Sequence, residues 1–285
     1  QADTVRTLDD YRALEDRLFA DLQQQVYEAV LPADRIVINR YNAGSRSDPG
    51  IWPVNWNRTF RLAPATEGPP RGAVLLLHGL TDSPYSLRSI GENLAARGFE
   101  VVGLRLPGHG TAPSGLLSFE IEDMQAAVRL AMRDLRAQDA PDRPLLIVGY
   151  SNGAALAVDY ALEALDDASL PKPAGLVLIS PAIGISKFAV VGRLKTGLSS
   201  VPGFERAAWE GIGTEFDPYK YTSFSFHAAG ETFRLTRALS RRIERRAGSA
   251  PLPGFPPVLA FLSTVDSTVR AEAVTDALLD HLAPD

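Results

Sequence analysis

The sequence predicts an α/β protein whose mostly parallel, doubly wound sheet is covered by helices on both faces. Short continuous apolar runs alternate with longer segments in which apolar residues recur at three and four positions. Continuous apolar strands are typical of a sheet that is buried on both faces, and the intervening pattern is that of amphipathic helices. The alternation breaks between about Gly184 and Pro253 and then resumes, which indicates an insertion between two core strands.

The first predicted element is a helix near the N-terminus. Thr7 can cap this helix, and Asp10 follows three positions later, as in a capping box. One face of the helix would carry Leu8, Tyr11, Leu14, Leu18, Leu22 and Val26. Pro32 would end it.

The remaining elements follow in order along the chain. The predicted strands cover residues 57–62, 73–78, 100–106, 144–150, 174–180 and 256–263. The predicted helices cover 86–98, 119–137, 151–165 and 269–282. We therefore expect an N-terminal helix (1–34), a core (35–183 and 254–285) and a cap (184–253), because so long an insertion should fold as a unit.

Composition narrows the functional class. A chain of 285 residues with 45% hydrophobic content can bury one large core. No apolar run reaches the length of a membrane span, so we expect a soluble protein without a transmembrane segment. The net charge is −5, and Glu244 interrupts the densest basic run (241–246), which argues against a nucleic-acid partner. With no cysteine, the chain has neither disulfides nor a thiol nucleophile.

The compartment stays open at this stage. The sequence begins with Gln1 rather than methionine, so we expect that a preceding segment has been removed. A lost export signal would fit that position, although no visible residue identifies one.

The residues Gly149-Tyr150-Ser151-Asn152-Gly153 carry the first chemical signal. They lie between a predicted buried strand and a helix, which is the setting of a nucleophile elbow. Glycines suit this turn because a Cβ would clash with the neighbouring strand and helix. The alternative is an ordinary strand–helix turn capped by a serine. We favour Ser151 as a nucleophile at a helix N-terminus, where amide dipoles favour developing negative charge.

Two further motifs make the resemblance specific. Leu77–Leu80 (Leu-His-Gly-Leu) resembles the His-Gly oxyanion turn of the α/β-hydrolase family, and Arg105–Gly110 (Arg-Leu-Pro-Gly-His-Gly) resembles its Gly-His-Gly loop. This form of the loop resembles that of bacterial carboxylesterases and monoacylglycerol lipases, and the sequence also resembles lysophospholipases. The resemblance covers roughly residue 73 to the C-terminus. Asn152 and Ala154 depart from the commoner Met and Gly.

The resemblance implies roles for other residues. The oxyanion hole would consist of the backbone N–H groups of Leu80 and Asn152. His78 and His109 belong to structural turns and are expected to bond loop backbone rather than act as bases. We expect His227, in the cap, to be a surface or pocket-lining residue.

The triad acid would be Asp266, which follows the predicted strand 256–263 at the position where the family places it. An N-cap role for the next helix is compatible with this. The family's other acid position, after the strand 174–180, holds Ser180-Pro181 and no carboxylate. We name Asp217, in the cap, as the next candidate.

The catalytic base of the triad has no counterpart at the position that the family pattern gives it. The family histidine follows one further strand, and this sequence contains neither that last strand nor the helix after it. His281 sits at the end of a helix with an apolar face. We therefore expect that the base lies beyond Asp285 rather than at His281, and that the sequence is a C-terminally shortened hydrolase.

The predicted function is that of a serine carboxylic-ester hydrolase acting through an acyl-enzyme. The apolar segment 187–204 could line an acyl pocket, which favours medium or long acyl esters over short ones; it could equally form a small core of the cap. The expected partner is a small-molecule ester, lipid-like in character, with no cofactor and no metal. The oligomeric state is open.

The alternative functions are those of a peptidase or amidase on the same scaffold, and of a binding protein with an inactive site. Dehalogenases and epoxide hydrolases are disfavoured because they place aspartate at position 151.

Overall fold

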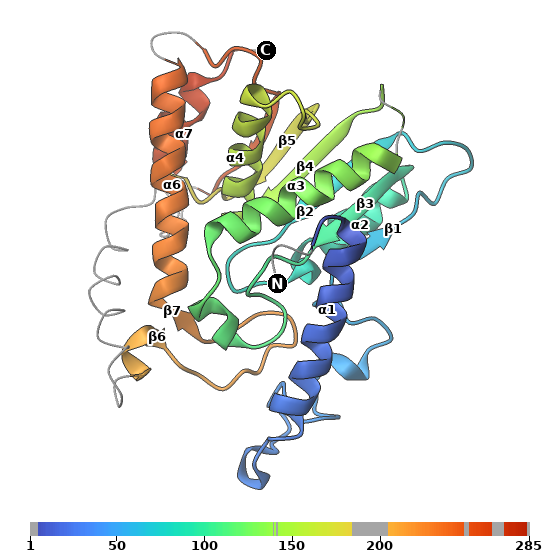
Figure 1. The fold of residues 1–285 in the computed structure, drawn as a ribbon, viewed down its shortest axis with the longest axis vertical. Helices are drawn as coiled ribbons and strands as arrows, with labels where there is room; N and C mark the ends of the chain where they lie inside the picture. Colours follow the sequence, from blue (N-terminus) through green and yellow to red (C-terminus); the bar gives the residue numbers. More distant parts are fainter. Residues whose placement is uncertain are drawn as a thin grey trace.

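The computed structural model describes residues 5–138, 140, 142–183, 205–247, 251–263 and 271–283. Its main sheet has the strand order β1-β3-β2-β4-β5-β8 (Figure 1). The strands are β1 (Phe60–Leu62), β2 (Gly72–Leu77), β3 (Phe99–Leu104), β4 (Leu145–Tyr150), β5 (Gly175–Ile179) and β8 (Val258–Phe261). All neighbours pair in parallel except β1, which runs antiparallel to β3. The predicted mostly parallel sheet is confirmed.

Helices cover both faces of this sheet, as predicted. They are α1 (Leu8–Leu22), α2 (Arg88–Ala95), α3 (Ile121–Gln138), α4 (Asn152–Asp166), α6 (Phe226–Ala247) and α7 (Ala271–Ala277). Because successive strand residues point to opposite faces, β2 contributes Leu75 and Leu77 to one buried cluster and Val74 and Leu76 to another. The first cluster includes α1, α3, α4 and α6, and the second includes α2. None of the helices in the described ranges is both long and apolar enough to cross a membrane.

The N-terminal helix begins as predicted, and its buried face matches the prediction only in part: Leu8 and Tyr11 are buried as expected. Thr7 Oγ1 accepts from the Asp10 N–H at 3.1 Å, and the Asp10 carboxylate accepts from the Thr7 N–H at 3.0 Å, so the capping box is present. The buried residues are Leu8, Tyr11, Glu15 and Phe19, whereas Leu14, Leu18, Leu22 and Val26 are only partly buried. The helix ends before Pro32: α1 stops at Leu22 and a single π-helical turn follows over Gln23–Tyr27.

The described part of the expected cap packs on the core. It contains a short hairpin of β6 (Trp209–Gly211) and β7 (Phe224–Ser225), followed by α6. The helix α6 lies beside α4 (Figure 1), where Thr236 Oγ1 donates to the Ala182 carbonyl and Arg242 pairs with Asp166. Apolar residues of α6 belong to the same buried cluster as the sheet. The segment 187–204, expected to line an acyl pocket, falls outside the described residues.

The last described helix is shorter than predicted. Within the expected helix 269–282, regular α-helical structure covers α7 and ends at Ala277. A 3₁₀ turn over Leu279–His281 follows. The side chains of Val274 and Leu278 are buried, so the predicted apolar face does contact the core.

Candidate active site

Ser151 occupies a sharp turn between β4 and α4. Its backbone has φ 53° and ψ −115°, a conformation that costs a non-glycine residue about 1–3 kcal/mol and persists only where its surroundings enforce it. Two hydrogen bonds hold the turn: the Ser151 N–H donates to the Ile179 carbonyl at 2.9 Å, and the Ala182 N–H donates to the Ser151 carbonyl at 3.0 Å. Both partners lie at the end of β5. The strained turn is thereby fixed to the edge of the sheet where the parallel strands end.

The two glycines of the motif are required by close packing. A Cβ on Gly149 would lie 2.5 Å from the Ala154 Cα, and a Cβ on Gly153 would lie 2.1 Å from the Leu77 carbonyl oxygen. Both distances are far below van der Waals contact, and the neighbouring atoms belong to the backbone. The first turn of α4 therefore rests directly on the end of β2. Ala154, which departs from the family pattern, fits here with its side chain buried.

The hydroxyl of Ser151 is not used as a helix cap. Ser151 is the N-cap residue of α4, yet its side chain accepts no capping hydrogen bond from the described residues of the helix. The side chain is half-buried rather than closed off. An ordinary serine cap, the alternative that the sequence left open, does not match this geometry.

The turn after β2 lies beside the elbow. Leu77 pairs with Gly149 in the sheet, so Gly79 and Leu80 follow at the same edge as Ser151. Within the described ranges, neither the Leu80 nor the Asn152 N–H donates to a backbone carbonyl of another element. The side chain of Asn152 points toward α3, where its amide contacts the Met124 sulfur at 3.6 Å. Asn152 therefore presents only its backbone toward the elbow.

The cap contacts this same turn. Thr81, next to Leu80, has φ 66°, and its carbonyl accepts from the Tyr221 N–H at 2.8 Å. The ring of Tyr221 lies 6.3 Å from the ring of His109 in a stacked arrangement. The segment before β7 is thus attached to both loops that flank the candidate site.

His78 and His109 are structural, as the sequence predicts. His78 Nε2 accepts from the Leu106 N–H at 3.0 Å, and its Nδ1 lies 2.9 Å from the Gly79 carbonyl. His109 Nδ1 lies 2.9 Å from the Pro107 carbonyl. Burial lowers the pKa of His109 to about 4 and, with His109 nearby, holds the pKa of His78 well below its usual range. Both rings are neutral at pH 7 and engaged with loop backbone.

The other two histidines are placed elsewhere. His227, at the start of α6, has its Nε2 2.7 Å from the Phe119 carbonyl. The carbonyl of His281 accepts from the Leu252 N–H at 2.7 Å. Nearby Gly254 lies against Leu165, in the last turn of α4. Ser151 is the N-cap of that helix of 15 residues, which is about 22 Å long, so His281 lies near its opposite end.

The candidate acids have different positions. Asp266 lies outside the described residues. The strand before it, β8, ends at Phe261, whose carbonyl accepts from the Ser180 N–H at the same edge of the sheet as the elbow. Asp217 accepts hydrogen bonds from the N–H groups of Tyr219 and Lys220, so its carboxylate stabilises a local turn. In the described part of the chain, no group of three or more His, Asp or Glu residues could hold a metal ion.

One supporting pair was not predicted. Arg105 Nη1 donates to the His109 carbonyl at 2.8 Å, and its guanidinium pairs with Glu15 of α1. Glu15 is buried between Tyr11 and Phe19. A carboxylate at helical spacing between two aromatic residues was the available signal, but its partner is far away in the sequence.

A family model and several curated relatives match the chain. The family described as serine aminopeptidase, S33, matches residues 68–205. A probable alcohol acetyltransferase of Saccharomyces cerevisiae is 31% identical over 34% of this chain and 28% of its own. The magnesium-chelatase 30 kDa subunit of Rhodobacter capsulatus is 32% identical over 45% and 46%. A thermostable monoacylglycerol lipase of Bacillus sp. is 32% identical over 41% and 43%. The matched part spans less than half the length of these curated relatives.

Solved structures show the same fold. A metagenome-derived lipolytic enzyme superposes with a TM-score of 0.58 at 23% identity, over 78% of this chain and 83% of that one. The monoacylglycerol lipase of Paleococcus ferrophilus superposes with a TM-score of 0.56 at 20% identity, over 79% and 83%. At these identities the likeness establishes the fold.

Proposed function

This chain has the α/β-hydrolase fold, and from that premise we propose that it is a serine carboxylic-ester hydrolase. Ser151 Oγ would attack the ester carbonyl and expel the alcohol, and water would then release the acid from the acyl-enzyme. The observation that carries the proposal is the backbone of Ser151, with φ 53° and ψ −115°. A strained turn that lifts a hydroxyl left free of capping is typical of a nucleophile rather than of a helix start.

The oxyanion would be stabilised by backbone donors. The N–H groups of Leu80 and Asn152 lie on the two turns that Gly153 holds in contact. Donors fixed in this way need no reorganisation as charge develops on the carbonyl oxygen, and one such donor contributes about 10²–10³ in rate. Because both donors belong to the backbone, the role is compatible with the unusual side chain of Asn152.

The proton transfers require an acid and a base. We assign the acid to Asp266, from its position after β8. Its carboxylate would fix the tautomer of a histidine and stabilise the imidazolium. The contacts of His78, His109, His227 and His281 tie each of them to a structural position, so we assign the role of base to none of these four.

The proposed substrate is a small-molecule ester with a lipid-like acyl group. Support comes from the names of the relatives: one is a monoacylglycerol lipase, and the solved structures include lipolytic enzymes. The proposed chemistry is that of the serine and backbone donors and includes no cofactor or metal.

Amide hydrolysis is the second candidate, favoured by the family description, serine aminopeptidase. The elbow and the backbone donors serve both reactions, because each passes through a tetrahedral intermediate and an acyl-enzyme. A third candidate, a binding protein with an inactive site, is favoured by the histidine positions described above.

Covalent labelling separates these candidates. We expect a fluorophosphonate probe to modify Ser151, with the site identified by peptide mass spectrometry. Ser151→Ala should abolish labelling. Ser180 is the matched control, since it is also a positive-φ serine at the end of a strand, and Ser180→Ala should retain labelling. Turnover of p-nitrophenyl butyrate against the p-nitroanilide of an amino acid then distinguishes esterase from peptidase. Absence of labelling, with the protein folded, would favour the binding protein.

A further inference from the structure

Arg40 is a buried cation without a countercharge. Its side chain is 1% exposed, although charged residues are almost never fully buried unless paired. Its guanidinium makes one hydrogen bond within the described residues, from Nη2 to the Gly110 carbonyl at 2.9 Å. The Nε and Nη1 donors have no partner, and no Asp or Glu of the described chain forms an ion pair with it. The rings of Tyr221 and Tyr41 lie 5.3 and 5.7 Å away and compensate the charge only in part.

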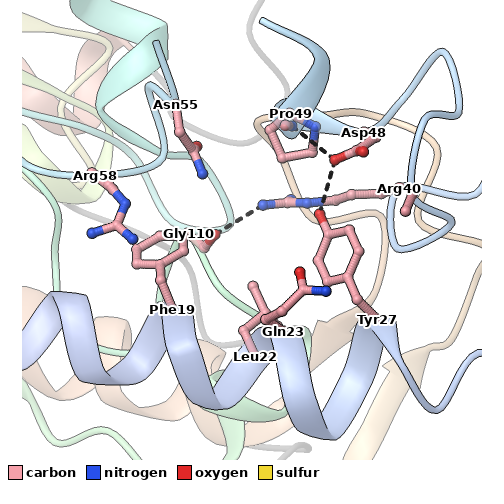
Figure 2. Close-up of a pocket in the computed structure, with 12 residues that line it drawn as sticks. Phe19, Leu22, Gln23, Tyr27, Arg40, Asp48, Pro49, Asn55, Arg58 and Gly110 are labelled. Carbon is pink, nitrogen blue, oxygen red and sulfur yellow. Dashed lines mark hydrogen bonds between the residues drawn. The ribbon is translucent and has the colours of Figure 1, made fainter. Parts of the chain in front are cut away.

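Arg40 is one of the residues that line a cavity of about 250 Å³. The walls come from the end of α1 and the following π-helical turn, from the loop before β1, and from Gly110 in the loop after β3. Figure 2 shows the Arg40 side chain crossing the middle of the lining residues, with its tip at Gly110. The space would hold about eight water molecules. It is large enough for a small organic anion.

The nearest acidic wall residue is already engaged. Asp48 accepts from the N–H groups of Gly44 and Gly50 at 2.8 and 2.7 Å and from the Tyr27 hydroxyl at 3.2 Å. Figure 2 shows Asp48 beside Tyr27 rather than paired with Arg40. Three donors already saturate much of this carboxylate, so the acceptor for Arg40 has to come from elsewhere.

The other walls suit an anion with a short apolar tail. Arg58 adds a second guanidinium, whose only ionic partner among the described residues is the exposed Asp16. Asn55 uses its side-chain oxygen to accept from Asn57, which leaves its NH₂ group as a donor. Phe19 and Leu22 line the cavity with apolar surface.

We propose that this cavity, defined by Arg40, Arg58, Asn55, Phe19 and Leu22, is a binding site for a small oxyanion. On a rotation of the Arg40 side chain toward the cavity, its guanidinium fork would donate to two oxygens of a carboxylate or a phosphate, the geometry in which arginine binds both groups most strongly. Binding would supply the acceptors that the buried donors lack. The site is separate from Ser151, and its test does not depend on the hydrolase activity.

Titration calorimetry on the purified 285-residue chain tests the proposal, with sodium butyrate and inorganic phosphate as separate ligands and butyramide as the neutral match of butyrate. Chloride keeps the ionic strength constant. We expect one site for at least one of the two anions and none for butyramide. At a tenfold excess over Kd, the anion should raise Tm by about 2–3 °C. The stronger of the two anions identifies the source of the oxyanion.

Variants locate the site. Arg40→Lys keeps the charge but removes the fork, and Arg58→Gln removes the second cation; we expect each to weaken binding at least tenfold. Arg46→Gln removes an exposed positive charge from the same loop and should leave Kd unchanged. If Arg40→Lys does not fold, Arg58→Gln and the comparison of butyrate with butyramide still decide. Equal binding of anion and amide, or anion binding unaffected by Arg58→Gln, overturns the proposal. The proposal is also overturned if neither anion binds at a 100-fold excess over protein, at anion concentrations up to about 100 mM. That result is expected if the cavity holds water only.

Discussion

Glu15 on α1 and Arg105 after β3 form an ion pair closed off from solvent, with 3.1 Å between Glu15 Oε1 and Arg105 Nε. The two side chains are 2% and 3% exposed. Glu15 also accepts from the N–H and the hydroxyl of Thr59, and Arg105 donates to the His109 carbonyl. The pair therefore connects the N-terminal helix to the loop beside the candidate active site.

Glu15→Gln should lower the free energy of unfolding by about 3–5 kcal/mol, because it leaves a buried guanidinium without its countercharge. The variant keeps the size of the side chain, so the loss reports the charge. The matched control is Asp16→Asn, which breaks the pair with Arg58 on the exposed side of the same helix and should cost less than about 1 kcal/mol. Urea unfolding followed by circular dichroism measures both. Equal stability of the two variants would contradict this account.

The same pair explains where the sequence prediction of α1 was wrong. The periodic apolar residues and the Thr7 cap correctly predict a helix, since both are local signals. They assign Leu14 and Leu18 to the buried face, whereas the structure buries Glu15 and Phe19. A glutamate becomes a core residue only because Arg105 reaches it from a distant strand end. No local pattern contains that information.

Gly153→Ala should destabilise the protein by at least about 2 kcal/mol and abolish labelling of Ser151. The added Cβ would meet the Leu77 carbonyl oxygen at 2.1 Å, so α4 has to move away from β2 and the elbow with it. Gly211→Ala is the control, because no atom lies within 4 Å of the added Cβ. Thermal unfolding and fluorophosphonate labelling are the measurements. A stable, fully labelled Gly153→Ala protein would mean that the elbow is not tightly packed.

Stability should fall as the pH is lowered from about 6.5 to about 4, in part through His109. Its pKa of about 4 in the folded protein lies below the unfolded value of 6.5. In this window the unfolded chain binds more protons, so the free energy of unfolding rises with pH and is lost on acidification. His109 contributes on the order of 3 kcal/mol to the change in the free energy of unfolding across this pH range.

His109→Gln should flatten that pH dependence, whatever its effect on absolute stability. Urea unfolding at intervals between pH 4 and 7 measures the slope for the wild type and the variant. An unchanged slope in His109→Gln would show that folding does not lower the pKa of this ring.

His281→Ala should leave fluorophosphonate labelling of Ser151 and any ester turnover within about twofold of wild type. The reason is position: the His281 turn lies at the end of α4 that is about 22 Å from the elbow. General base catalysis requires hydrogen-bond reach of the nucleophile, which such a separation excludes. Initial rates with p-nitrophenyl butyrate provide the test. A loss of 100-fold or more would make His281 the base.

The candidate site was predictable where its signals are local. The elbow around Ser151 and the turn at His78 each combine glycines with a strand end, and the contacts of Gly153 now give the physical reason for that spacing. The Arg40 cavity was not predictable, because its walls come from α1, the loop before β1 and Gly110. Which buried cation lacks a partner is decided only when these segments pack together. The role of Asp266 stays a prediction, since it falls outside the described residues.

The strain at Ser151 gives the last prediction, a comparison of glycine with alanine at two positions. At Ser151, φ is 53° and ψ is −115°, so Ala keeps the strained Cβ whereas Gly relieves about 1–3 kcal/mol of it. The greater conformational freedom of Gly in the unfolded chain offsets roughly 0.5–1 kcal/mol of this gain in stability. Ser151→Gly should therefore be more stable than Ser151→Ala. Ser89 is exposed in the first turn of α2, where the order should reverse because Gly costs up to about 1 kcal/mol relative to Ala in a helix. Urea unfolding of the four variants measures both differences. If alanine is the more stable residue at both positions, the elbow stores no strain.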